Sequence, residues 1–252
     1  MKITLLCENM VSEKVWDCGL AEWGFSAFIE KDNTKILFDF GTSDVYIKNA
    51  KALGIDLGKV DFLVLSHHHN DHFGGIHYHP FKTKKTFITH PDVPSKLPEK
   101  DAIKLKQDFE ILTSKKPLEF AKDCFYLGQI PRTTDFENGD YEDDDMHDDS
   151  ALVFKTSKGS VIVTGCSHAG ICNICEYAKK VTGQKLYAVI GGFHLFEDNL
   201  KAFEGTMRYL EKEKVEKLSP MHCVEFSLLA KMQQKFGFKK YSAGDVINIE
   251  ER

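Results

Sequence analysis

Apolar residues recur along the chain in short runs that alternate with amphipathic stretches, a pattern typical of strands followed by helices. The expected strands lie at residues 3–6, 25–29, 35–38, 60–65, 151–155, 160–164, 186–190 and 217–219, with a last one centred on Ile247. Helical spacing covers residues 43–53, 169–181, 198–213 and 225–236, and Gly54 is placed to end the first of these helices. Each half therefore predicts strands and then a strand–helix alternation, which indicates two sheets faced by helices.

The middle of the chain, residues 77–150, is less regular and contains six of the seven prolines. It includes short strand candidates at 86–89 and 124–127 and a helix candidate within 96–112. A proline-rich interval between two regular halves predicts an inserted small α+β subdomain or lid within one domain that spans residues 1–252. The acidic run at 137–145 predicts a solvated loop, with metal collection as the alternative.

Composition places the chain among ordinary globular proteins, because 42% of its 252 residues are hydrophobic and 28% are charged. The net charge of -5 argues against a dedicated nucleic-acid partner, since no basic stripe is available for a phosphate backbone. The first apolar stretch is broken by Glu8 and Asn9, and no segment has the length of a membrane span, so we expect a cytoplasmic protein without a membrane partner. A homo-oligomer is compatible with this composition.

Cysteine usage also fits a reducing compartment. The chain has seven cysteines, an odd number without a regular framework. Cys172 and Cys175 form a C-x-x-C pair on a predicted helix, where no partner for a redox or zinc site is evident. We therefore expect buried free thiols there.

A dense group of histidines follows the strand predicted at residues 60–65, where the sequence reads SHHHNDH from Ser66 to His72. His67 and His69 are two positions apart, so an extended or looped backbone points both rings the same way. Asp71 and His72 are adjacent, so a tight turn presents them together. This H-x-H-x-D-H pattern offers two nitrogen ligands for one metal ion, and a carboxylate with a nitrogen for a second. Imidazole and carboxylate suit Zn²⁺, with Fe or Mn²⁺ as alternatives.

The alternative interpretation is a surface histidine tract that binds metal adventitiously. The cluster is internal, follows a buried strand and is interrupted by an aspartate, and all three features disfavour that interpretation. A ligand-bearing loop at the end of a buried strand is also a rigid place for a site.

H-x-H-x-D-H after an apolar strand resembles the signature of the metallo-β-lactamase superfamily. Further matching segments are LFDFG at 37–41, Thr164-Gly165 at the end of a strand, and PMHC at 220–223. The resemblance implies an α/β fold, the four-layer αββα sandwich of the metallo-β-lactamase type. It also implies a metal-dependent hydrolase that uses a metal-bound hydroxide and two divalent ions per chain, with zinc preferred.

The resemblance implies the following ligands: His67, His69 and His168 for the first metal, and Asp71, His72 and His222 for the second. It also implies that Asp39 supports the metal loop. One position departs from the pattern, because Cys166 stands where most hydrolases of the superfamily have a bridging aspartate. Cys166 is therefore a candidate for an additional metal contact.

Four residues have candidate roles beyond metal binding. Asp71 is a candidate for orienting or relaying a proton. His194 follows two glycines, which allow close approach of a ligand, so it is a catalytic or substrate-binding candidate with a structural histidine as the alternative. Arg132 is the best clamp for an anion, or else a surface ion pair with Glu137 or a neighbour. Trp23 is a candidate for stacking on an aromatic substrate, with core packing as the alternative.

A narrower resemblance rests on AEWGFS at 21–26, IPRTTDFE at 130–137, TGCSHAGI at 164–171 and GGFHL at 191–195. These segments are similar to a subgroup labelled 7,8-dihydropterin-6-yl-methyl-4-(β-D-ribofuranosyl)aminobenzene 5′-phosphate synthase, which implies a small phosphorylated or pterin-like substrate. One fold hosts many reactions, so two alternatives stay open. They are a nucleic-acid phosphodiesterase, and a non-catalytic metal- or redox-responsive binding protein that uses Cys166 and Cys223.

Overall fold

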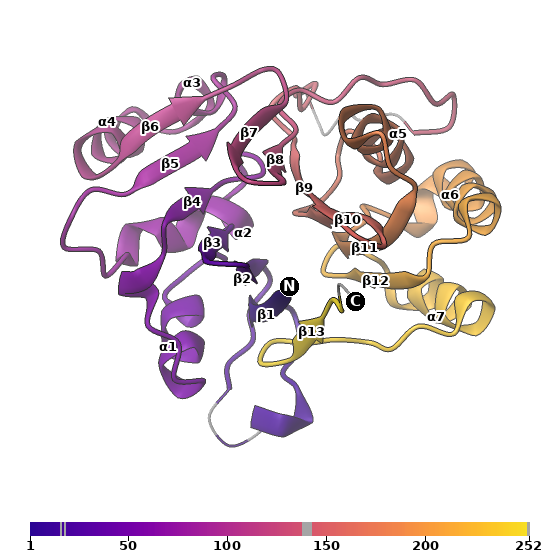
Figure 1. Ribbon diagram of the computed structural model, residues 1–252, viewed down its shortest axis with the longest axis horizontal. Coiled ribbons are helices and arrows are strands. Elements are labelled where there is room, and N and C mark those ends of the chain that lie inside the picture. Colours follow the sequence, from indigo (N-terminus) through magenta and orange to yellow (C-terminus); the bar gives the residue numbers. More distant parts are fainter. Residues whose placement is uncertain (16, 18, 138–142, 251–252) are drawn as a thin grey trace. The chain divides into compact units, whose positions relative to one another are not determined.

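Two compact units make up the computed structural model, which describes residues 1–15, 17, 19–137 and 143–250 (Figure 1). The first unit comprises Met1–Ser114 with Tyr241–Glu250, and the second comprises Lys115–Lys240. Each unit has one mixed β-sheet with helices, so the predicted α/β class with two sheets is confirmed. The strands and helices predicted in the first and last thirds are present, with ends that differ by a residue or two.

The described part of the first unit has a seven-stranded sheet with the order β13-β1-β2-β3-β4-β5-β6. The strands are β1 (Lys2–Cys7), β2 (Ser26–Lys31), β3 (Thr34–Phe38), β4 (Phe62–Val64), β5 (Thr86–Thr89), β6 (Glu110–Thr113) and β13 (Val246–Asn248). Strands β13 to β3 pair antiparallel, whereas β3 to β6 pair parallel. The carboxyl ends of β3 and β4 therefore lie at the same edge of the sheet.

The helices of the first unit pack against apolar strand residues. They are α1 (Val45–Ala52), α2 (Asn70–Phe73), α3 (Val93–Lys96) and α4 (Glu99–Asp108), with short 3-10 turns η1 (Glu13–Val15), η2 (Leu57–Lys59) and η3 (Gly74–Tyr78). Tyr46 of α1 and Leu105 of α4 belong to the same buried cluster as Leu37, Leu63 and Phe87 of the sheet.

The helix expected within residues 96–112 is present as α4 but is shorter than that interval. It ends at Asp108, and residues 110–113 form β6. Most side chains of β6 are exposed, as its burial pattern shows. The strand therefore carries little apolar alternation from which sequence alone could predict it.

The described part of the second unit has a six-stranded sheet with the order β12-β11-β10-β9-β8-β7. Its elements are β7 (Leu118–Ala121), β8 (Cys124–Tyr126), β9 (Ala151–Thr156), β10 (Gly159–Thr164), α5 (Ile171–Thr182), β11 (Leu186–Gly192), η4 (Glu197–Asn199), α6 (Leu200–Glu213), β12 (Lys217–Met221) and α7 (Phe226–Phe236). Strands β10, β11 and β12 are parallel neighbours, and the remaining pairs are antiparallel.

Helices α5, α6 and α7 lie against this sheet (Figure 1) and share one apolar cluster with it. Ile174 of α5, Leu210 of α6 and Met232 of α7 are buried with Ile162 and Val189 of the strands. These helices have their apolar residues at helical spacing, so one stripe of each is covered by the sheet. Cys172 and Cys175 are buried free thiols on α5, as predicted.

The interval 77–150 contributes β5 and β6 to the first sheet and β7 and β8 to the second. Its role as an inserted subdomain or lid stays a prediction. Part of the acidic run, residues 138–142, lies outside the described residues. Among the helices that are described, none combines the length and apolarity needed to cross a bilayer.

Candidate metal centre

The histidine loop of the first unit begins where β4 ends. Strands β3 and β4 are parallel neighbours with Phe38 opposite Val64, so the residues that follow them, Asp39 and Ser66, meet at one sheet edge. The Asp39 backbone N–H donates to the Val64 carbonyl at 2.9 Å, which fixes the two segments together. The predicted support of the metal loop by Asp39 therefore has a structural basis.

The Asp39 carboxylate is fully buried and accepts three hydrogen bonds. Its Oδ1 accepts from the Ser66 backbone N–H at 2.7 Å, and its Oδ2 accepts from Ser66 Oγ at 2.7 Å. Oδ2 also lies 2.7 Å from Nδ1 of His72, a ring that is itself fully buried. Asp39 thus holds both the start of the loop and one candidate ligand.

These contacts fix which nitrogen each ring presents. Asp39 is a hydrogen-bond acceptor when ionised, so Nδ1 of His72 carries the proton of that bond. Ser66 Oγ gives its only proton to Asp39, so Nδ1 of His67, 2.8 Å from Oγ, is the donor in that contact. In both neutral rings Nε2 is then the lone-pair atom suited to a metal ion.

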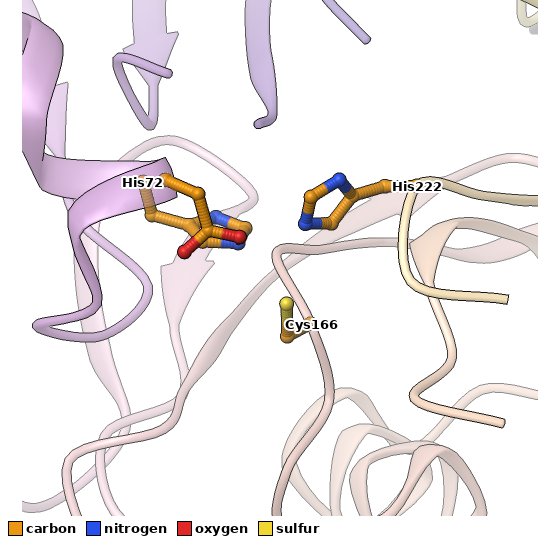
Figure 2. Close-up of side chains that lie close together, drawn as sticks. His72, Cys166 and His222 are labelled. Atoms are coloured by element: carbon orange, nitrogen blue, oxygen red, sulfur yellow. The ribbon is translucent and has the colours of Figure 1, made fainter. Parts of the chain in front are cut away.

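Backbone hydrogen bonds clamp the rest of the loop in place. The amides of Phe25 and Phe40 donate to the carbonyls of Asp71 and His72, at 3.1 and 2.8 Å. His67 lies with its ring centroid 4.8 Å from that of His69 and 4.3 Å from that of His72. The candidate ligand atoms of His67 and His69 lie within 4.8 Å of each other, as do those of Asp71 and His72 (His72 is labelled in Figure 2). The loop therefore brings its four candidate ligands together.

Glycines let the loop pack directly onto backbone. A Cβ on Gly75 would lie 1.9 Å from the carbonyl oxygen of Phe40, and a Cβ on Gly24 would lie 2.7 Å from that of Asp71. Glu22 fastens the neighbouring turn, because its carboxylate accepts from the backbone N–H groups of Thr42 and Ser43. Glu22 therefore fixes the turn that follows Phe40 and Gly41.

The second unit places its candidate residues at the carboxyl ends of three parallel strands. Thr164, the last residue of β10, pairs with Gly191 of β11, and Gly192 pairs with Met221, the last residue of β12. The segments that follow, with Cys166 and His168, His194, and His222, therefore emerge at one edge of the sheet. The candidate ligand atoms of Cys166 and His222 lie within 4.8 Å of each other (Figure 2).

Two groups of hydrogen bonds fix these loops relative to one another, one at the Gly192 carbonyl and one at the Cys223 thiol. The Gly192 carbonyl oxygen accepts from Thr164 Oγ1 at 2.9 Å and from Ser167 Oγ at 2.6 Å. The Cys223 thiol accepts from the His194 backbone N–H at 3.3 Å and donates to the Cys166 carbonyl at 3.3 Å. Cys223 therefore positions the loops of Cys166 and His194, which is a structural role for this buried thiol.

Left-handed backbone conformations concentrate at these loops. Asp39, Ser167, His194 and His222 have φ values of 56°, 67°, 48° and 55°. A non-glycine residue in this region costs of order 1 kcal/mol and persists where the surroundings impose it. The ring centroid of His194 lies 4.1 Å from that of His168.

Three supporting residues were not predicted from sequence. Asp149 accepts from the Ala169 backbone N–H at 2.8 Å and so fixes the turn after His168. Asn173 of α5 accepts from the backbone N–H groups of Thr133 and Thr134 at 2.7 and 3.0 Å. Glu137 accepts from two backbone N–H groups at the start of α5. Burial raises the pKa of the Glu137 carboxyl, while those two hydrogen bonds oppose the rise.

The predicted substrate-binding residues lie in different units. Arg132 belongs to the second unit, where its guanidinium donates to the Asp145 carbonyl, while Glu137 is engaged at α5. Trp23 belongs to the first unit and is 57% exposed, so it is not a core residue. The supporting role of Asn173 could have been suspected from sequence, because this residue comes shortly after the TGCSHAGI segment at 164–171.

The donor set fits a divalent metal ion. Imidazole nitrogens, one carboxylate and one thiolate are the ligand types that zinc prefers in proteins. Each of His67 and His72 also has the hydrogen-bonded Nδ1 that is usual for a metal-ligating histidine. The candidate ligands are His67, His69, Asp71 and His72 in the first unit, and Cys166, His168 and His222 in the second, and these side chains could therefore hold metal ions.

The sequence profile of the metallo-β-lactamase superfamily matches residues 24–222, and the chain belongs to this superfamily. The predicted resemblance and the αββα sandwich type of the fold are thereby confirmed. Proteins of this superfamily are mostly metal-dependent hydrolases.

Individual relatives cover nearly the whole chain. The crystal structure of Tm1679, described as a metal-dependent hydrolase of the β-lactamase superfamily, is 27% identical with a TM-score of 0.81 and covers 99% of both chains. The 7,8-dihydropterin-6-methyl-4-(β-D-ribofuranosyl)-aminobenzene-5′-phosphate synthase of Methanocaldococcus jannaschii is 31% identical over 91% of this chain and 90% of its own. An uncharacterized protein of the same organism is 29% identical over 98% of this chain and 100% of its own.

Proposed function

We propose that this protein is a metal-dependent hydrolase that acts on a small, phosphorylated or pterin-like substrate. The observation that carries the proposal is the Asp39–Ser66–His67–His72 network, which fixes the orientation of two fully buried imidazole rings. A surface histidine tract that binds metal adventitiously would not need a buried network with this proton arrangement. The name of the 31% identical synthase supports the pterin-like substrate.

The proposed ligands come from both units. His67 and His69 would bind the first ion with His168, and Asp71 and His72 would bind the second with His222. The match of the superfamily profile to residues 24–222, which include all six residues, supports this assignment. Cys166 would add a thiolate to the second ion, because its Sγ lies near the candidate ligand atom of His222.

Divalent cations held by these residues would lower the pKa of a water molecule and so supply a nucleophile at neutral pH. The chain's own residues would guide the proton and the substrate. Asp71 has a carboxylate oxygen 3.6 Å from Nε2 of His72 and would accept or relay a proton beside this proposed ligand.

His194 and Arg132 would handle negative charge. The strained backbone of His194 and its ring contact with His168 suit a group that touches the substrate as charge develops. Arg132 would pair its planar guanidinium with a phosphate or carboxylate. Trp23, which is exposed, would be a further substrate contact. The interval 77–150 would act as an inserted subdomain or lid. A cytoplasmic location and a homo-oligomer remain proposals as well.

A substrate panel tests this proposal. Protein loaded with Zn²⁺, Mn²⁺ or Fe²⁺ would be assayed against phosphomonoesters, phosphodiesters and lactones, before and after removal of metal by a chelator. We expect hydrolysis in at least one class, its loss on chelation, its return on adding metal, and a drop of at least about 10³-fold in His67→Ala. Activity that survives chelation, or that His67→Ala retains, contradicts the proposal. Hydrolysis of RNA or DNA alone would favour the phosphodiesterase alternative.

A further inference from the structure

Large apolar side chains are exposed at the sheet edge that bears His194 and His222. Strands β11 and β12 are parallel neighbours, and the helices that follow them, α6 and α7, begin at this edge (Figure 1). The first residue of α7, Phe226, is 80% exposed, the highest value among the exposed large hydrophobic residues of the described chain. The first residue of α6, Leu200, is 49% exposed.

Phe226 is not required for the core of the second unit. Leu228, Leu229 and Met232 supply the buried stripe of α7, and all three belong to the apolar cluster beneath the helices. Exposing an aromatic ring gains nothing for folding, since its apolar surface stays in water. Single exposed hydrophobic residues are common, so the meaning of Phe226 depends on what lies beside it.

The segment before Phe226 is joined firmly to the segment after His194. Leu195 pairs with Val224 in a parallel bridge, and the Leu195 N–H donates to the Cys223 carbonyl at 3.1 Å. The Glu225 N–H donates back to the Leu195 carbonyl at 2.9 Å. The side chain of Glu225 also accepts from the backbone N–H of Glu197 at 2.7 Å. These hydrogen bonds join residues 195–197 to residues 223–225 in one framework, which carries both Phe196 and Phe226.

This framework places a second aromatic ring beside the candidate site. The ring of Phe196 meets that of His194 edge to face, with centroids 5.1 Å apart. The ring of His194 lies 4.1 Å from that of His168, a candidate ligand. A row of rings therefore leads from His168 through His194 to Phe196, and Phe226 lies at the same edge. An aromatic group bound along this row would find ring faces and edges to contact.

We propose that Phe196 and Phe226 form the subsite that receives a flat aromatic ring of a phosphoester substrate. This inference rests on the proposed function, because it assigns the reacting phosphoryl group to the proposed metal ligands and His194. The subsite would select aryl-bearing phosphoesters over aliphatic ones with the same phosphoryl group. Both phenylalanines are specificity residues in this account, and neither takes part in proton transfer.

Two phosphonates test the subsite, since their C–P bond survives a hydrolase and binding can be measured at equilibrium. Phenylphosphonate and methylphosphonate share the anionic head and differ in the ring. Their dissociation constants for the zinc-loaded protein would be measured by calorimetry. The variants are Phe226→Ala, Phe196→Ala, the ring-retaining Phe226→Tyr, and Ile103→Ala as a control for loss of an exposed apolar side chain on α4.

We expect the parent protein to bind phenylphosphonate more tightly than methylphosphonate. Phe226→Ala should weaken phenylphosphonate binding about tenfold, with methylphosphonate changed less than about twofold. Phe196→Ala should act in the same sense, whereas Phe226→Tyr and Ile103→Ala should match the parent. Equal affinity of the parent for both phosphonates, no binding of either, or equal weakening of both by Phe226→Ala would overturn the proposal.

The same samples separate this inference from its alternatives. If Phe226→Ala turns a dimer into a monomer by size-exclusion chromatography and leaves the ratio of the two affinities unchanged, Phe226 is a contact between copies and the subsite is wrong. Hydrolysis in the substrate panel without any preference for phenylphosphonate overturns the subsite and keeps the proposed function. A Phe226-dependent preference for phenylphosphonate in a protein that hydrolyses no substrate of the panel supports the subsite and overturns the proposed function.

Discussion

Asp39→Ala is expected to lower zinc affinity by about 10- to 100-fold, the usual effect of losing a hydrogen-bond partner of metal-ligating histidines. The substitution removes the acceptor of Nδ1 of His72, which then loses the bond that fixes its tautomer and orientation. It also removes the acceptor of Ser66 Oγ, the hydroxyl that contacts Nδ1 of His67, so the proton of this hydroxyl is no longer directed away from Nδ1 of His67. The substitution also leaves the buried Ser66 N–H without its acceptor, so we expect the free energy of unfolding to fall by about 3 kcal/mol or more.

Zinc affinity would be measured by competition with a chromophoric chelator, and stability by denaturant unfolding of the metal-free protein. Asp39→Asn keeps one acceptor oxygen and an amino acid that tolerates a positive φ, so it should lose less stability but still bind zinc weakly. Asp61→Ala is the matched control, because the Asp61 carboxylate also accepts a backbone N–H, that of Lys35, but in an exposed position. Unchanged zinc affinity in Asp39→Ala would show that this network does not support a metal site.

Gly75→Ala is expected to destabilise the first unit by at least about 3 kcal/mol. Its new Cβ would lie 1.9 Å from the Phe40 carbonyl oxygen and 2.6 Å from that of Ser43. Both contacts are backbone atoms, so neither can rotate away as a flexible side chain would. Phe40 is also the residue whose N–H donates to the His72 carbonyl, so the clash would displace the loop of candidate ligands.

Thermal unfolding should show the loss as a decrease in Tm of about 6 °C or more for a chain of this size. Gly58→Ala is the matched control, because its nearest contact would be the exposed side chain of Asp56 at 3.0 Å. That variant should stay within about 0.5 kcal/mol of the parent. A Gly75→Ala protein as stable as Gly58→Ala would contradict the close packing of this loop.

The regular helices and strands could be predicted because the apolar spacing of each one lies within a single short stretch of sequence. Strand β10 contains the apolar run 161–163, and α5 repeats its apolar residues at helical spacing. Strands β6 and β7 could not be predicted, since few of their side chains are buried and only pairing with a neighbour makes them strands. The first four candidate ligands could be predicted for the same local reason, because they share one short loop.

The supporting residues depend on contacts between distant parts of the chain. Glu137 meets the start of α5 across 35 residues, and Asp149 meets Ala169 across 20. In the sequence, Asp149 looks like one more residue near an acidic run. Its burial and its bond to the turn after His168 appear only when the chain is folded. Sequence could name candidate ligands, but not the residues that hold their loops.

Elemental analysis of protein purified without chelator tests the central claim most directly. We predict about two divalent ions per chain, mainly zinc, with about one lost in His67→Ala and about one lost in His222→Ala. These two residues belong to different units, so a loss in both variants would support ligands from both halves of the chain. A parent protein with no metal after purification, and none after incubation with zinc, manganese or iron, would contradict the account.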